Sequence, residues 1–250
     1  MILFHEGLPG SGKSYEAVAR VICKALKDGR PVDAYIEGLD LARIAEAAEV
    51  PLDQVEQLLI PMERGDVLTW YKVARRNALV VLDEAQNFWP TGRQRLDDAI
   101  TQAVTEHRHL GQDILLMGQS HKDVHVLWRR RIDKLYVFTK ADAIGLDQRY
   151  TVATLKATRP EKFERVSFST QKYDPRWFGS YASVVDGDVQ TENYKDDRAN
   201  ILKGKFFRLV VPATVVACIG GALVLYDFFN PDQVEPSAAA KPASPPASVA

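Results

Sequence analysis

A glycine-rich run near the N-terminus ends in a lysine and a serine. The run EGLPGSGKSYEA matches the spacing G-x-x-x-x-G-K-[ST]. Glycines let successive backbone N–H groups turn inward, and the positive end of a following helix adds to the attraction for anions. The pattern predicts a phosphate-binding loop for a polyphosphate; the alternative is an ordinary strand-to-helix turn. The predicted nucleotide-binding residues are Gly7, Leu8, Pro9, Gly10, Ser11, Gly12, Lys13, Ser14 and Tyr15.

Two adjacent acids follow a second apolar run, ALVVLDEAQ. We expect Lys13 to reach the β and γ phosphates of ATP, and Ser14 and Asp83 to hold Mg²⁺. Glu84 is then suited to act as general base on the attacking water. A small-molecule kinase needs no such glutamate beside the aspartate, so the pair favours hydrolysis. The alternative interpretation is a strand that simply ends in solvated acids.

Further polar residues could complete a hydrolytic site. Gln119 ends the apolar run DILLMGQS, where motor ATPases often keep a residue that senses the γ phosphate, although strands commonly end in polar residues. Arg130, in the run Arg129–Arg131, could act as an arginine finger on a neighbouring subunit. Arg108 and Arg93 are rivals for that role, and a solvated basic patch is the alternative. The sequence does not choose among them.

Four histidines raise the question of a metal site, because His121 and His125 are one helical turn apart. The others are His107 and His109. No nearby cysteine completes a structural zinc set, and a phosphate loop already recruits Mg²⁺. We therefore do not predict a zinc site.

The arrangement of apolar runs indicates the elements that position these residues. Short apolar runs alternate with helical patterns up to about residue 175, which is typical of an α/β fold with a mostly parallel central sheet. Predicted strands are ILFH (2–5), VDAYI (32–36), ALVVLD (78–83), DILLMG (113–118) and LYVFT (135–139). Predicted helices are KSYEAVARVICKALKDG (13–29), LDDAITQAVTEHRHLG (96–111) and the stretch around HKDVHVLWRR (121–130).

Two further runs, QRYTVATLKA (148–157) and KFERVSFSTQKY (162–173), predict a β-hairpin at the edge of the core. The aromatic-rich segment YDPRWFGSYASV (173–184) follows. We expect it to pack against the hairpin or to lie near a membrane surface, rather than to stack on nucleic-acid bases.

The composition and net charge do not favour a dedicated nucleic-acid-binding protein. The chain has 250 residues, is 46% hydrophobic and carries a formal net charge of -1. Such a balance gives no overall basic footprint of a dedicated nucleic-acid binder. The two cysteines, Cys23 and Cys218, lie far apart in the chain and predict no disulfide framework, which fits a reducing compartment.

An 18-residue run without a charged side chain, Leu209 to Tyr226, lies near the C-terminus. A helix of that length spans about 27 Å, close to the ~30 Å hydrocarbon thickness of a bilayer. A buried core helix is the alternative, but basic residues precede the run and aromatic residues flank it, as at membrane interfaces. The predicted organisation is a cytoplasmic domain (1–200), a transmembrane helix (206–226) and a Pro/Ala-rich periplasmic tail (227–250).

Taken together, these features resemble the zonular occludens toxin family of filamentous-phage assembly proteins. The likeness rests on the phosphate loop close to the initiator Met, on VVLDEAQ, on EHRHLGQDILLMGQS and on the late apolar run. The predicted fold is a P-loop NTPase with an appended β-hairpin and a single transmembrane helix. The resemblance implies an ATPase of the host inner membrane that drives phage extrusion. Implied partners are other copies in a ring, phage coat proteins, the phage single-stranded DNA complex and the inner membrane. The short tail departs from the longer outer domain of some relatives.

Two other functions fit parts of this pattern. A DNA translocase tethered by its membrane helix would share the ATPase chemistry but should show DNA-stimulated turnover that depends on salt. A nucleotide-gated scaffold would bind ATP, seldom hydrolyse it and recruit coat proteins. A membrane-bound kinase is a third alternative, with no acceptor that the sequence identifies.

Overall fold

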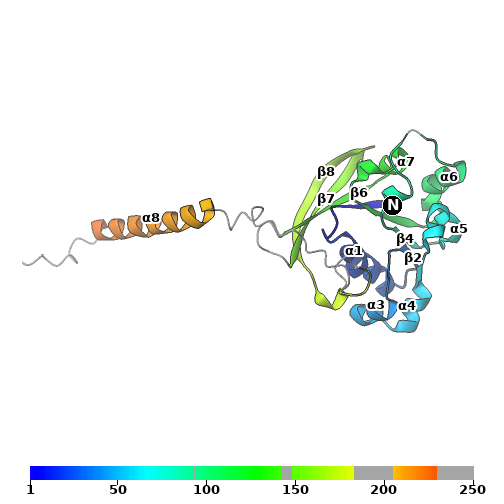
Figure 1. The fold of residues 1–250 in the computed structure, drawn as a ribbon, viewed down its shortest axis with the longest axis horizontal. Helices are drawn as coiled ribbons and strands as arrows, with labels where there is room; N and C mark the ends of the chain where they lie inside the picture. The colour runs from blue at the N-terminus through cyan, green and yellow to red at the C-terminus, as the bar shows by residue number, and fades with distance from the viewer. Residues whose placement is uncertain (93, 142–147, 183–204, 230–250) are drawn as a thin grey trace, which may run out of the picture. The chain divides into compact units, whose positions relative to one another are not determined.

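The chain divides into two compact units, residues 1–195 and 196–250. The computed structural model describes residues 1–92, 94–141, 148–182 and 205–229. The first unit is an α/β domain, and the second contains one long helix (Figure 1).

An eight-stranded sheet, counted over the described residues, forms the centre of the first unit. The strand order is β3-β2-β4-β5-β1-β6-β7-β8. Every pair from β3 to β6 is parallel, whereas β6, β7 and β8 pair antiparallel. The strands are β1 (Ile2–Glu6), β2 (Val32–Tyr35), β3 (Leu59–Pro61), β4 (Leu79–Leu82), β5 (Asp113–Gly118), β6 (Lys134–Lys140), β7 (Arg149–Arg159) and β8 (Lys162–Lys172).

The central strands are buried on both faces, which explains their continuous apolar runs. All four residues of β4 are buried. Because successive side chains of a strand point to opposite faces, Leu79 and Val81 join one hydrophobic cluster, and Val80 and Leu82 join the other. The predicted strands over 2–5, 32–36, 78–83, 113–118 and 135–139 are confirmed.

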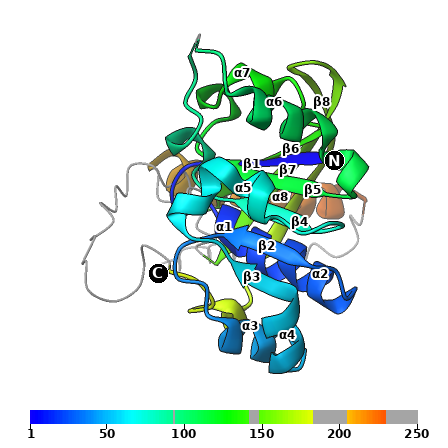
Figure 2. The same ribbon diagram turned by 90° about the vertical axis from the view of Figure 1, so that its right-hand side faces the viewer.

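Helices cover the two faces of the sheet (Figure 2). The first cluster joins the sheet to the helices from α1 to α4, and the second joins it to α5, α6 and α7. The helices are α1 (Lys13–Glu16), α2 (Cys23–Lys27), α3 (Leu41–Ala48), α4 (Leu52–Leu58), α5 (Trp70–Val73), α6 (Asp98–Glu106), α7 (Val126–Arg129) and α8 (Lys205–Phe229). A π-helical stretch, η1 (Ala17–Ile22), joins α1 to α2, so the predicted first helix is present with a wider central turn.

The predicted β-hairpin is confirmed as β7 and β8, and it extends the sheet beyond β6. The register slips between Thr154 and Leu155, which is a β-bulge. After β8 the chain crosses back to the helices. The 3₁₀ turn η7 (Pro175–Trp177) packs against α3 and buries Trp177 in the first cluster, which also contains Tyr150 and Val152 of the hairpin. The prediction of packing against the hairpin is therefore correct only in part, because the helices provide the main contact.

We call residues 174–182 the strap. Asp174 N donates to the Tyr15 hydroxyl at 2.7 Å, Asp40 N donates to Ser180 O at 3.0 Å, and Ala182 N donates to Glu37 O at 2.9 Å. The strap therefore ties the end of the hairpin to the first helix and to the loop after β2.

The helix predicted around 121–130 is broken. Its residues form a 3₁₀ turn, η5 (His121–Asp123), and the short α7, separated by extended Val124. Ser120 caps the first turn, and the His125 side chain accepts from Leu127 N to begin α7. His121 and His125 therefore do not lie on one helix.

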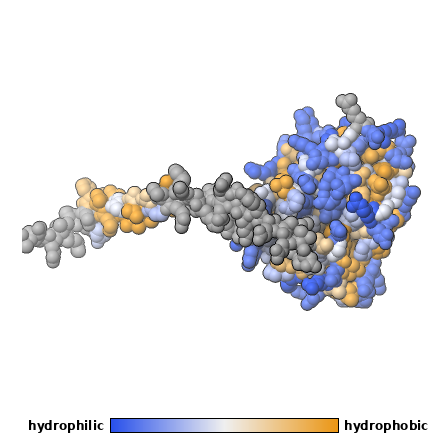
Figure 3. All heavy atoms as spheres, in the orientation of Figure 1, coloured by the Kyte–Doolittle hydropathy of each residue, from blue (hydrophilic) through white to orange (hydrophobic). Residues whose placement is uncertain are grey.

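The second unit contains α8, which spans 25 residues and covers the predicted helix over 206–226. Its described side chains are mostly apolar and exposed (Figure 3). By length and hydropathy, none of the helices in the described ranges qualifies as a membrane span.

Candidate functional site

The glycine-rich loop connects β1 to α1 at the carboxyl edge of the sheet. Gly12 has a φ of 100°, a left-handed conformation that side chains other than glycine adopt only with strain. Lys13 is buried and folds back over the loop, where its Nζ donates to Gly7 O at 2.8 Å and to Leu8 O at 3.3 Å. The loop thus forms a cradle with a lysine inside it.

The two predicted metal ligands are in contact. Ser14 Oγ donates to Asp83 Oδ2 at 3.2 Å, although the residues are 69 positions apart. Strand β5 lies between β1 and β4, so the loop after β1 and the acids after β4 face one another across its end. Parallel strands align their carboxyl ends at one edge, which agrees with the prediction from the two motifs that Ser14 and Asp83 share one Mg²⁺.

Burial shifts the pKa values of Lys13, inside the cradle, and of Asp83, which faces it. Burial raises the pKa of Asp83 to about 6, and the neighbouring Glu84 charge adds to the rise. Burial lowers the pKa of Lys13, while the carboxylates of Asp83 and Glu84 oppose that change. A charged ligand that binds here would therefore contact a buried cation, Lys13, and a partly buried acid, Asp83.

The cradle fits a phosphate group with a bound Mg²⁺. The Ser11 hydroxyl is buried and has no hydrogen-bond partner among the described residues, so a phosphate oxygen would satisfy it. Ser14 and Asp83 offer the hydroxyl and carboxylate oxygens that Mg²⁺ prefers. No group of three or more metal-ligating side chains occurs in the described ranges.

Glu84 lies beside Asp83 in a left-handed conformation, with φ 50° and ψ 44°. Its backbone N–H donates to Asp83 Oδ1 at 2.8 Å. The Gln86 side-chain amide donates to Glu84 Oε2. The turn η3 (Ala85–Asn87) that follows holds Gln86 next to the acids. Sequence reasoning gave Gln86 no role, although it belongs to the same VVLDEAQ run.

An aromatic cluster supports the far side of the loop. The Tyr173 ring lies 4.9 Å from Tyr15 and 4.7 Å from Tyr150, measured between ring centroids. A Cβ on Gly12 would lie 2.9 Å from the Tyr173 hydroxyl and 3.3 Å from Tyr150 Cγ. The Tyr150 hydroxyl donates to Glu16. The side chain of Tyr15 is therefore part of the packing between the hairpin and the first helix.

The remaining predicted residues are not gathered at the loop. Gln119 follows β5 at the carboxyl edge and is exposed. Arg108 lies toward the opposite edge, where it bonds both oxygens of Asp133 at 2.7 and 2.9 Å, just before β6. Arg93 lies outside the described residues.

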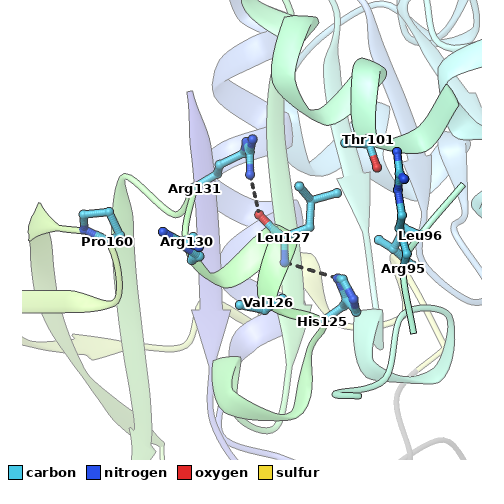
Figure 4. A pocket seen from close by; sticks show the side chains of 9 residues that line it. All are labelled: Arg95, Leu96, Thr101, His125, Val126, Leu127, Arg130, Arg131 and Pro160. Atoms are coloured by element: carbon cyan, nitrogen blue, oxygen red, sulfur yellow. Dashed lines mark hydrogen bonds between the residues drawn. The ribbon is translucent and has the colours of Figure 1, made fainter. Parts of the chain in front are cut away.

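Arg130 is exposed in a groove of about 510 Å³ beside α7 (Figure 4). The groove includes Arg95 and Arg131, and Arg131 is held by Leu127 O at 3.3 Å and by Thr105 Oγ1 at 3.2 Å. Arg130 and Arg108 therefore do not reach the loop of their own chain.

A hydrogen-bonded pair at the end of β1, Glu6 and His121, was also not predicted from the sequence. Glu6 accepts from the His121 backbone N–H at 2.7 Å and pairs with His121 Nδ1 at 2.5 Å. These bonds lower the pKa of Glu6 against the opposing effect of burial. His121 thus anchors the segment after Gln119 to the strand that enters the loop.

A family model described as "Zonular occludens toxin (Zot)" matches residues 1–188. The chain belongs to this family. The chain is 32% identical over 251 residues to the "Gene 1 protein" of Xanthomonas phage phiLf, covering 95% of this chain and 56% of that protein. It is 28% identical to the "Putative assembly protein ORF301" of Pseudomonas phage Pf3, covering 78% of this chain and 61% of that protein.

A third relative in the Zot family is the "Zona occludens toxin" of Vibrio cholerae, 25% identical over 82% of this chain and 58% of that protein. The chain thus spans 56–61% of the length of these relatives.

The chain is also similar to two solved structures. The N-terminal domain of zonular occludens toxin from Neisseria meningitidis has a TM-score of 0.48 and 21% identity over 70% of this chain and 96% of that chain. The genome packaging NTPase B204 of Sulfolobus turreted icosahedral virus 2, solved with ATP-gammaS, has a TM-score of 0.43 and 13% identity over 67% of this chain and 96% of that chain.

Proposed function

We propose that the chain is a Mg²⁺-dependent ATPase, anchored in the host inner membrane, that powers the assembly and extrusion of a filamentous phage. The contact between Ser14 and Asp83 carries the enzymatic part of the proposal, because it joins the two separate sequence motifs at one edge of the sheet. The position of Glu84 next to that contact favours hydrolysis.

The chain's own residues divide the chemistry among them. The loop amides and Lys13 bind the phosphates, and Lys13 exchanges its bonds to Gly7 O and Leu8 O for bonds to the ligand. Ser14 and Asp83 would hold Mg²⁺, which neutralises charge on the phosphate oxygens. Glu84 accepts a proton from the attacking water. Gln119, which follows β5, would sense the γ phosphate.

The biological part of the proposal has separate support. The family includes proteins named for phage assembly, such as the Pf3 protein, and that role is extended here to this chain. The uncharged run from Leu209 to Tyr226, preceded by basic residues, supports a single membrane pass with the first unit in the cytoplasm and the tail in the periplasm. Proposed partners are other copies in a ring, phage coat proteins and the phage single-stranded DNA complex, with Arg130 or Arg108 reaching a neighbour's site.

Two substitutions test the proposal in the detergent-purified full chain. Lys13→Ala should lower nucleotide affinity and reduce ATP turnover by at least about 100-fold, because it removes a donor to the transferred phosphate. Glu84→Gln should keep nucleotide binding and reduce turnover by about 100- to 10,000-fold, because the general base is lost. The mass of the detergent complex reports the number of subunits.

Virion release separates the motor from its alternatives. A motor loses release with both substitutions, whereas a scaffold loses it only with Lys13→Ala. Single-stranded DNA added to the turnover assay over a range of salt concentrations identifies a translocase by stimulation that weakens as salt rises. If wild-type protein neither binds nor hydrolyses ATP, the proposal is wrong.

A further inference from the structure

The side chain of Gln86 lies between three parts of the site. Its Nε2 donates to Glu84 Oε2, from two residues further along the chain. Its Oε1 is buried and has no hydrogen-bond partner among the described residues. The same Oε1 lies beside Gly118, the last residue of β5, where a Cβ would approach it to 2.5 Å. A buried amide oxygen left without a donor costs free energy, so the position of Gln86 needs a reason other than fold stability.

Gly118 leaves room for this amide. Its φ is not in the left-handed region, so its backbone does not require glycine. Glycine is required at this position because a side chain would not fit: a Cβ would also lie 3.2 Å from Phe4 Cζ. Gly118 O accepts from Gly7 N at 3.3 Å, so the same residue touches the phosphate loop on its other side. Gln86 is therefore packed where β4, β5 and the loop meet.

Glu84 is held in a conformation that needs such support. A left-handed conformation strains a residue that has a side chain, and it persists only where surrounding contacts impose it. The Asp83 carboxylate fixes the backbone N–H of Glu84, and Gln86 fixes one oxygen of its side chain. In the described part of the chain, Oε1 of Glu84 has no donor and remains able to accept a hydrogen bond from water.

We propose that Gln86 is the positioning residue of Glu84: its amide holds one carboxylate oxygen and turns the other toward the attacking water, and Gly118 provides the space that makes this possible. The inference rests on the proposed function, since it assigns Glu84 the role of general base. Gln86 is assigned to act through Glu84, so it is a positioning residue and not a catalytic one.

Two independent substitutions test this assignment in the full-length protein. Gln86→Ala removes the amide, and Gly118→Ala displaces it without changing it. Both should lower kcat for ATP by about 10- to 100-fold, the range expected when a catalytic group is misplaced by about 1 Å. The KM and the affinity for a fluorescent ATP analogue should stay within about twofold of wild type.

The double variant gives the decisive measurement. Since both substitutions break the same contact, Gln86→Ala/Gly118→Ala should be no slower than the slower single variant, rather than slower by the product of the two effects. The matched control is Asn87→Ala, an exposed neighbour in the same turn, which should keep wild-type kcat.

Other outcomes overturn the assignment. Wild-type kcat in both single variants would show that Glu84 needs no positioning by Gln86. Parallel losses of nucleotide affinity and melting temperature would show a structural role instead. If Glu84→Gln leaves turnover unchanged, Glu84 is not the general base and the positioning role fails with it, whereas the proposed hydrolytic function fails only if wild-type protein does not hydrolyse ATP.

Discussion

Asp83 is subject to opposing demands from folding and from metal binding. Burial disfavours its charged form and raises its pKa from 3.8 to about 6. A metal ligand must be ionised, so the charge that the fold disfavours is the one that the proposed chemistry requires. Asp83 therefore lowers stability at neutral pH, and the same charge is needed for the proposed metal binding.

The sign of this effect gives a prediction for Asp83→Asn. The folded pKa lies above the unfolded value of 3.8, so the folded state binds more protons between pH 3.8 and about 6. Stability therefore falls as pH rises through that range, and the loss persists above it. Asp83→Asn should raise the melting temperature at pH 7.5 by a few degrees, with a difference that shrinks toward pH 4.5, and should abolish Mg²⁺-dependent turnover.

Differential scanning fluorimetry across pH 4.5 to 7.5 measures this difference. The matched control is Asp53→Asn, which removes an exposed acid from α4 and should leave the pH profile of the melting temperature near that of wild type. A constant difference between wild type and Asp83→Asn at all pH values would contradict the prediction.

The residues of the cradle were predictable because their types and spacing follow from phosphate chemistry. The two motifs predicted that Ser14 and Asp83 share a metal ion, and the two side chains are in contact. Gln86 was not predictable, because its role depends on the left-handed turn at Glu84 and on the space beside Gly118. Neither feature leaves a pattern in one sequence.

A buried ion pair fixes the edge of the sheet at the level of its elements. Asp33 of β2 is 2% exposed and accepts from Arg75 N and Nε, each at 2.8 Å. Arg75 Nη2 also donates to Val32 O and to Leu58 O. Arg75 thus joins β2 to the end of α4, from which the three-residue strand β3 follows.

Removal of Arg75 should destabilise the first unit strongly. Arg75→Met leaves the Asp33 carboxylate buried without its partner, which costs about 3–5 kcal/mol. Arg76→Met changes the exposed neighbour and should cost less than about 0.5 kcal/mol. Chemical denaturation followed by tryptophan fluorescence measures both. Equal stability of the two variants would contradict this account.

Most strands could be predicted and the segment from residue 41 to 75 could not. The central strands are apolar on both faces, so their runs stand out. Strand β3 has only three residues and depends on Arg75, which is distant in sequence. The helix expected over 121–130 failed because Val124 is extended, in an isolated bridge with Pro90, and that pairing is also long-range.

At the scale of the whole molecule, the proposed anchor can be tested without truncating the chain. Wild-type protein should sediment with inner membranes and resist carbonate extraction. Val216→Arg/Leu223→Arg should release it, because each arginine near a helix centre opposes insertion by about 2.5–3.5 kcal/mol. Val216→Ala/Leu223→Ala is the matched control and should stay bound.

ATP turnover of the released double-arginine protein reports whether the first unit is intact. Wild-type protein that is extracted by carbonate, or arginine variants that stay in the membrane, would contradict the proposed anchoring.

The predicted α/β architecture with an edge hairpin followed from local patterns, whereas the strap did not. Its bonds join Asp174 to Tyr15 and Ala182 to Glu37, which are remote in sequence and mostly made through the backbone. Backbone contacts of this kind carry no residue signature. The position of the strap could therefore not be predicted from the sequence.

The contacts of the strap determine the order in which bonds of the first unit would break under a pulling force. A pull applied beyond Ala182 would break the bond to Glu37 first, then the bond at Asp40, and would next lift Trp177 from its hydrophobic cluster. Only after that would tension reach Tyr15, beside the phosphate loop. The contacts of the strap would thus break one after another, so a small force would be absorbed before it reached the glycine-rich loop.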